Sequence, residues 1–486
     1  MKRRAFLATA IGGTALSCSM HGRNAENSFK QHDISWEPDE AITADGMSIS
    51  EGVKILKKGE KYNTAPVIRE EILENPNAVF IIKAGVKNSR DENGTWKPCN
   101  DQMERFGRRV SDLVFRQGTE KGGRTYINPN MVGHYDPKNP TYHNGWCVHP
   151  HFTSGFVESL RDIGNTNSAI GVRGGLRHNH MVEWGLTDIF NEHRLPVIEA
   201  HTQFFRDYKR SDLLWHKTPG AVVAKRSPTY KPVGMKDTTF INIAQAHTHQ
   251  LGHTTLTLKN MQGVMPRGYG HVCDTWTGLD IWRNSLMDDF TPDYRAKIEK
   301  LYVKHANMGF KHWDENGIYK QYRANGGYDT FMRELDKYRN SEGDERKKAM
   351  ENMSAITDSR VFWVEQWAQR MMDIIEGFPT PDINMVEGVF GRGDDCGVEH
   401  TDFMTVGRSM TSVDSVTSWM MGHDPRELPY LRIAKERGIG DNDIENIPIY
   451  YLSEAGLEKV NDYRDLKRAK LGVYQYGMKK NGARFF

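Results

Sequence analysis

Three histidines follow a run of β-branched residues in the segment 238–253, at His247, His249 and His253. In a strand, residues two apart face the same side, so His247 and His249 could present two imidazoles to one ion. If the chain turned helical after Gln250, His249 and His253 would share one face of that helix. The residue types therefore predict a divalent-metal site with His247 and His249 as ligands, and leave the identity of the metal open.

Histidine is concentrated in one part of the chain, since 13 of the 19 lie between His134 and His271. Two further H-x-H pairs fall in this window, at 149/151 and 178/180. The alternative to a metal site is that these are polar residues at strand ends, hydrogen-bonded to the backbone. No HExxH motif occurs, and no carboxylate stands at a recognised ligand spacing beside the pairs, so spacing alone does not decide.

A second group of residues suits an anionic ligand. Lys259 and Asn260 stand where a predicted strand gives way to a helix, and Arg267 follows. Lysine can bind a carboxylate, phosphate or sulfate as a point charge, and arginine adds a fork of donors. With Asn130, which follows an earlier strand, Asn260 and Arg267 are the predicted substrate-binding residues. The alternative is a lysine on a solvated face and an asparagine near a helix end capped by Gly263.

Carboxylates gather in the glycine-rich segment 386–397, which follows another predicted strand. Its glycines let the backbone approach a ligand closely, and Glu387, Asp394 and Asp395 supply the acids. The segment is not a GxGxxG motif opening a helix, so a dinucleotide site is not favoured. Glu387 is the predicted acid–base group, with Lys259 as its catalytic partner, although a simple acidic surface turn explains the segment equally well. Farther on, Asp414 is expected to cap a helix.

Helical and strand patterns that would position these residues alternate from about Glu104 onward. Helical spacing predicts helices near 106–114 and 156–160, while RTYI, SAIGV and PVIEA read as strands. This alternation predicts an α/β fold with a mostly parallel sheet covered by helices. Asn130, His247 and Glu387 all come at or after strand ends, so we expect them at the carboxyl edge of the sheet, where α/β folds bind ligands.

The patterns divide the chain into five parts. These are an export signal (1–18), an N-terminal lead-in (19–104), the first part of the α/β core (105–290), a helical insertion (291–377) and the second part of the core (378–486).

The composition excludes some partners. The 486 residues include 65 basic and 63 acidic ones, a balance that gives no reason to expect a nucleic acid. No apolar run approaches the roughly 18 residues that a membrane-spanning helix needs. Cysteines beyond the export signal are far apart and form no CxxC motif, so both disulfides and unpaired buried thiols remain open.

The first residues suggest export. Arg3-Arg4, followed by a mildly apolar stretch, is similar to a twin-arginine signal, with an ordinary basic N-terminus as the alternative. The ending at Cys18 is similar to a bacterial lipoprotein cleavage site, although Ala15 stands where leucine is usual. We therefore expect an exported protein, either in the periplasm or lipid-anchored through Cys18 to the cell envelope.

Several runs of residues resemble one known family. The runs 126–130, 148–175, 240–267, 382–397 and 410–447 occur in that order. They resemble the bacterial and archaeal family catalogued as domain of unknown function three-six-two, over about 105–455. The most specific pieces are Thr248-His249, Lys259-Asn260 and Val413-Asp414. The resemblance implies an α/β fold and says little about chemistry.

This chain departs from the family pattern near the predicted site. Asn128 and His247 stand where the pattern has lysines, and Glu387 replaces an aspartate. The loss of these lysines weakens the case for an anion-binding role like the one the family pattern implies. The additional histidine makes a metal site more plausible in this chain.

Two functions follow as hypotheses. The first is an exported protein that binds a metal and an anionic small molecule at a His/Lys/Glu cleft. The alternative is a non-catalytic accessory protein that captures or helps degrade envelope polysaccharide, including sulfated glycans, because exposed aromatic residues stack on sugar rings. The sequence gives neither the substrate nor the oligomeric state.

Overall fold

A computed structural model describes twelve stretches of the chain and a few residues besides. The stretches are 65–87, 99–118, 124–131, 145–165, 168–172, 197–199, 213–230, 238–249, 252–265, 341–345, 367–393 and 397–472.

The main element is a ten-stranded sheet with the order β14-β13-β2-β12-β11-β9-β4-β5-β6, and β10 pairs with the end of β9. Its strands are β2 (Val79–Lys83), β4 (Arg124–Pro129), β5 (Ser168–Val172), β6 (Val197–Glu199), β9 (Thr238–His249), β10 (His253–Thr255), β11 (Ile383–Gly393), β12 (Gly397–Gly407), β13 (Ile449–Ser453) and β14 (Gly456–Lys459). The run β11-β9-β4-β5-β6 is parallel throughout, as is the pair β2-β13. The prediction of a mostly parallel α/β sheet is confirmed.

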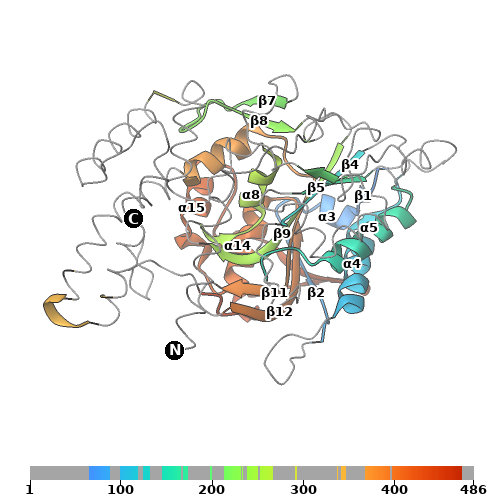
Figure 1. Cartoon of the computed structure of the whole chain (residues 1–486). Coiled ribbons are helices and arrows are strands. Elements are labelled where there is room, and N and C mark those ends of the chain that lie inside the picture. Colours follow the sequence, from blue (N-terminus) through green and yellow to red (C-terminus); the bar gives the residue numbers. More distant parts are fainter. Residues whose placement is uncertain are drawn as a thin grey trace, which may run out of the picture.

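Two helices, α4 (Asn100–Val114) and α5 (Pro150–Asp162), cover one face of the sheet (Figure 1). Their apolar sides pack with alternate strand residues, among them Phe80 and Met385, into one buried cluster. The helices cross very closely, because a Cβ on Gly155 would lie 1.9 Å from the carbonyl oxygen of Glu104. Both helices were predicted from the spacing of their apolar residues, and both predictions are confirmed.

The opposite face is covered by α8 (Thr257–Asn260), α14 (Met410–Met420) and α15 (Pro429–Glu436) (Figure 1). Val413 and Val416 of α14 pack against Val79, Ile81 and Val386. These strand residues alternate with those that face α4 and α5, so their side chains point to the opposite side of the sheet. The sheet is therefore buried on both sides, which explains why its central strands read as continuous apolar runs.

Shorter elements complete the described part: β1 (Val67–Ile68), α3 (Glu70–Leu73), β3 (Phe115–Arg116), β7 (Leu213–Lys217), β8 (Arg226–Tyr230), η3 (Met261–Val264), η5 (Pro425–Glu427), η6 (Ile444–Asn446) and η7 (Tyr463–Asp465). Within the described stretches, no helix has the length and apolar character that crossing a membrane requires.

Three local predictions were wrong. His253 begins strand β10 rather than continuing a helix, because the chain turns back and pairs His253 with His249. The first part of the glycine-rich segment is a strand rather than a turn, because β11 extends to Gly393 and pairs with β12. Asp414 does not cap its own helix, because α14 begins earlier, with Ser409 as its N-cap.

Other predictions fall outside the described residues. The export signal with Cys18 lies there, as do Arg267 and the pair His178/His180. Of the predicted helical insertion, 343–345 and 367–377 are described as helix, and the domain boundaries stay predictions.

Candidate functional site

Asparagine side chains form a buried row across three parallel strands. Asn128 of β4, Asn242 of β9 and Asn384 of β11 are direct neighbours in the strand pairing. The Asn242 amide donates to Asn384 Oδ1 at 3.0 Å and to the Thr257 carbonyl at 3.0 Å, and Asn128 donates to Asn242 Oδ1 at 3.3 Å. The row therefore joins the three strands through their side chains, at the carboxyl end of β4 and farther from the ends of β9 and β11.

Asn260 of α8 completes this row. Its amide nitrogen donates to Asn242 Oδ1 at 2.7 Å and to the Asn128 carbonyl at 2.8 Å, and it is fully buried. Although predicted as a substrate-binding residue, Asn260 thus directs its donor to the protein. It holds α8 against the strand ends and so positions its neighbour, Lys259.

Asp414 holds the other end of α8. Its carboxylate accepts from the Thr257 N–H at 2.8 Å, the Thr257 hydroxyl at 2.5 Å and the Leu258 N–H at 3.0 Å. Burial raises the pKa of Asp414 to about 7, and the hydrogen bonds from Thr257 and Leu258 offset only part of this rise. Asp414 therefore caps α8 from inside α14, which a reading of local sequence could not find.

Lys259 is buried at this edge, with 4% of its surface exposed. Its ammonium group donates to the Thr255 hydroxyl of β10 at 3.1 Å. Asn130 comes directly after β4, and its backbone bonds both to Ile243 of β9 and to Val148, just before α5. Lys259 and Asn130 therefore lie on segments that meet at the ends of β4 and β9; their role in binding a substrate stays a prediction.

Glu387 lies on β11 facing α5, and 1% of its surface is exposed. Its carboxylate accepts from the backbone N–H of Val389 at 2.7 Å and of His149, the N-cap of α5, at 3.3 Å. Burial raises its pKa to about 7. A bulge in β11 just after Glu387 frees the Val389 N–H for this bond. Glu387 is thus a buried acid that can titrate near neutral pH.

A thiol lies near this acid. Burial, and then the charge of Glu387, raise the pKa of Cys99 to about 12. Since the thiolate is the reactive form, Cys99 is not a nucleophile at neutral pH.

Gln245 of β9 is the direct neighbour of Glu387 in the strand pairing, so both side chains lie on one face. Its amide nitrogen donates to the Phe390 carbonyl at 2.9 Å. Its buried Oε1 has no hydrogen-bond partner among the described residues. A buried acceptor of this kind beside an acid suits a ligand that brings a donor.

The two predicted metal ligands have different neighbours. The His247 ring contacts Trp146, with centroids 5.2 Å apart, whereas the His249 ring stacks on Trp367 at 6.5 Å. His149 and His151 lie at the start of α5 rather than in a strand. The described residues contain no group of three or more His, Cys, Asp or Glu side chains arranged to hold an ion. A metal at His247 and His249 stays a prediction.

A comparison with protein families matches residues 126–418 to the family described as domain of unknown function DUF362. The chain belongs to this family. The comparisons with curated proteins and with solved structures give no match.

The DUF362 region contains β4, β9, α8 and β11, and therefore every element that positions the site. Strands β2, β13 and β14 and helix α4 lie outside the match but complete the same sheet and its cover. Sequence reasoning missed Asn242, Gln245 and Asn384, because only the pairing of β4, β9 and β11 makes them neighbours. The signal available was a buried polar residue between apolar neighbours, at Asn242 and Gln245 in β9 and at Asn384 in β11.

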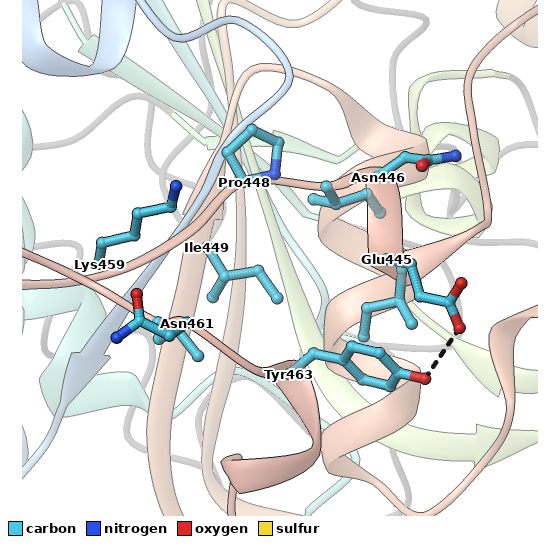
Figure 2. Close-up of a pocket in the computed structure, with 10 residues that line it drawn as sticks. Glu445, Asn446, Pro448, Ile449, Lys459, Asn461 and Tyr463 are labelled. Carbon is cyan, nitrogen blue, oxygen red and sulfur yellow. Dashed lines mark hydrogen bonds between the residues drawn. The ribbon is translucent and has the colours of Figure 1, made fainter.

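A surface pocket of about 260 Å³ lies elsewhere, between η6 and the β13–β14 hairpin (Figure 2). Tyr463 forms one wall and donates its hydroxyl to Glu445 at 3.2 Å. None of the predicted site residues lines this pocket.

The raised pKa of Glu387 predicts how stability depends on pH. The folded state keeps the proton up to about pH 7, whereas an exposed glutamate loses it near its ordinary value of 4.5. Stability should therefore fall as pH rises from about 4.5 to 7, and then level off. Glu387→Gln resembles the protonated form, so the variant should be more stable than the wild type at pH 8 by about 1–3 kcal/mol, and nearly equal at pH 5.

Urea unfolding of both proteins at several pH values measures this effect. Asp414 contributes a similar fall to both proteins, so the difference between them isolates Glu387. A difference that is the same at pH 5 and pH 8 would contradict the raised pKa.

Proposed function

We propose that this DUF362 protein binds an anionic small molecule at the carboxyl ends of β4, β9 and β11, with Lys259 as the cation and Glu387 as a proton-transferring acid or base. The observation that carries the proposal is that the segments carrying these groups reach one edge of the sheet, with Glu387 facing α5 and Lys259 on α8 at the opposite face. Glu387, Lys259 and the start of α5 lie on segments that end at one edge of a parallel sheet, where α/β folds bind ligands.

A purely structural role explains Glu387 less well. Its carboxylate accepts two backbone N–H groups, but the side-chain oxygen of a glutamine could accept one of them without the cost of burying a charge. A buried acid whose ionisation opposes folding is typical of a catalytic or binding site. The Gln245 Oε1 beside it, which has no hydrogen-bond partner in the described part of the chain, is a second group that a ligand would satisfy.

Lys259 supports the anionic character of the ligand. Its ammonium is buried and donates to the neutral hydroxyl of Thr255. A buried ammonium gains more from an anion than an exposed one, because water screens the attraction less. The fixing of α8 by Asn260 and Asp414 keeps this cation in place.

Ligand screening tests the proposal. Thermal shifts would be measured for the wild type with small carboxylates, phosphates and sulfates at constant ionic strength. Lys259→Met should reduce the affinity for any anion that binds by at least about tenfold. Lys467→Met, which removes an exposed lysine distant in sequence, is the control and should leave affinity unchanged. An anion bound equally well by both variants would argue against the site.

The sequence also predicts a metal ligated by His247 and His249, which elemental analysis of purified protein would test. The wild type should then contain stoichiometric metal, and the double alanine variant should not. The polysaccharide alternative predicts retention of sulfated or neutral oligosaccharides without turnover. Export through Arg3-Arg4 and anchoring at Cys18 belong to both functions and are tested by cell fractionation of the Arg-to-Lys and Cys-to-Ser variants.

A further inference from the structure

The Gln245 side chain presents an acceptor of fixed orientation beside Glu387. Its amide nitrogen donates to the Phe390 carbonyl at 2.9 Å. Because a carbonyl oxygen only accepts, this bond determines which end of the amide is the nitrogen and directs Oε1 elsewhere. Oε1 is buried, and no residue that the structure describes donates a hydrogen bond to it. A buried acceptor in this state costs free energy unless another group donates to it.

Regular strand pairing stops close to this acceptor on both sides. Strand β4 ends at Pro129, which pairs with Ile243, just before Gln245 in β9. On the other side, the register between β9 and β11 shifts directly after the pair formed by Gln245 and Glu387. Bulges of this kind are frequent next to active sites, where they redirect side chains. Alternate residues of a strand share a face, so Gln245 lies with Ile243 on the side of α5, as Glu387 does.

A neutral donor suits this place better than a cation. Glu387 already accepts the backbone N–H groups of Val389 and His149. Burial raises the pKa of Glu387 to about 7, so near this pH much of the carboxyl carries no charge. Gln245 adds only a neutral oxygen. Burying an ammonium beside these groups would cost much more free energy than burying a hydroxyl or an amide N–H, which a single acceptor satisfies.

We propose that Gln245 Oε1 accepts a hydrogen bond from a neutral hydroxyl or amide N–H of the ligand, so that the preferred anion carries such a donor. This inference rests on the proposed function and names the substrate class of that site. A donor held at Gln245 places the adjacent part of the ligand beside Glu387, the acid–base group. Gln245 is then a specificity-determining residue, because an analogue without the donor leaves Oε1 buried and unpaired.

The test compares small carboxylates that differ in this donor. Butyrate, its α-, β- and γ-hydroxy derivatives, succinamate and γ-aminobutyrate would be titrated against the full chain at neutral pH and constant ionic strength. The best hydroxy or amide compound should bind the wild type at least about tenfold more tightly than butyrate. Gln245→Met should abolish that preference while leaving butyrate affinity within about twofold. The hydroxy and amide arms tell the two kinds of donor apart.

Gln369→Met is the matched control, because the Gln369 Oε1 accepts from Arg437 at 3.3 Å, and this variant should keep the full preference. The preference is a ratio of affinities within one protein, so a loss of stability does not imitate its loss. The inference is overturned by a preference that survives in Gln245→Met, by hydroxy and amide compounds that bind the wild type no better than butyrate, or by γ-aminobutyrate as the tightest ligand. Each of these results leaves the proposed function intact. If no anion binds the wild type, both fail.

Discussion

Replacing Asp414 by alanine should lower the free energy of unfolding by at least about 3 kcal/mol, because the buried N–H groups of Thr257 and Leu258 lose their acceptor and the Thr257 hydroxyl keeps only a 3.4 Å bond to the Met410 carbonyl. Each buried donor that loses its partner costs about 1–3 kcal/mol. The helix α8 should also shift, since Asp414 holds its first turn. Urea unfolding followed by far-ultraviolet circular dichroism measures the loss.

Asp424→Ala is the matched control for this variant. Asp424 likewise caps a short helix, accepting from the Arg426 N–H at 3.0 Å, but it is partly exposed. Its loss should cost only about 1 kcal/mol, because water replaces the missing bond. Equal losses in the two variants would show that Asp414 is not the buried cap described above.

Replacing Asn242 by leucine, which has the same branching and the same number of side-chain heavy atoms but no polar group, should destabilise the protein by about 3–5 kcal/mol. Asn242 is fully buried at the centre of the asparagine row, where it accepts from Asn128 and Asn260 and donates to Asn384 and the Thr257 carbonyl. Leucine can make none of these four hydrogen bonds, so the buried polar groups of the row lose a partner. The same substitution should weaken anion binding, because α8 carries Lys259.

Asn446→Leu serves as the comparison. Asn446 is exposed, and its amide donates to Asp441 at the surface. We expect a change within about 0.5 kcal/mol. If Asn242→Leu is as mild as this control, the row does not fix α8, and the positioning role of Asn260 is wrong.

Much of the sheet could be predicted from the sequence. The helical spacing near Phe106 and Phe156 and the β-branched runs before Asn128 and His247 each correspond to an observed element. These signals are local, since each depends on residues within one helix or strand. The direction of β12 and the pairing of β2 with β13 depend on contacts between distant residues, and the sequence pattern does not contain them.

The site could be predicted only in part. Lys259 and Glu387 stand next to clear strand ends, so their type and place could be read directly. Gln245 comes to lie beside Glu387 only when β9 and β11 pair in parallel. Likewise, Asp414 serves a helix more than 150 residues away in sequence. Pairing between distant segments, rather than residue type, supplied what was missed.

The most direct test of the central claim is calorimetry of anion binding near pH 7, in two buffers with different ionisation enthalpies. An anion placed beside Glu387 raises the pKa of that carboxyl further, so the wild type should take up a fraction of a proton on binding. Glu387→Gln should bind the same anion with little or no proton uptake. Identical proton uptake in both proteins, or none in either, would contradict the assignment of Glu387 as the acid–base group of this site.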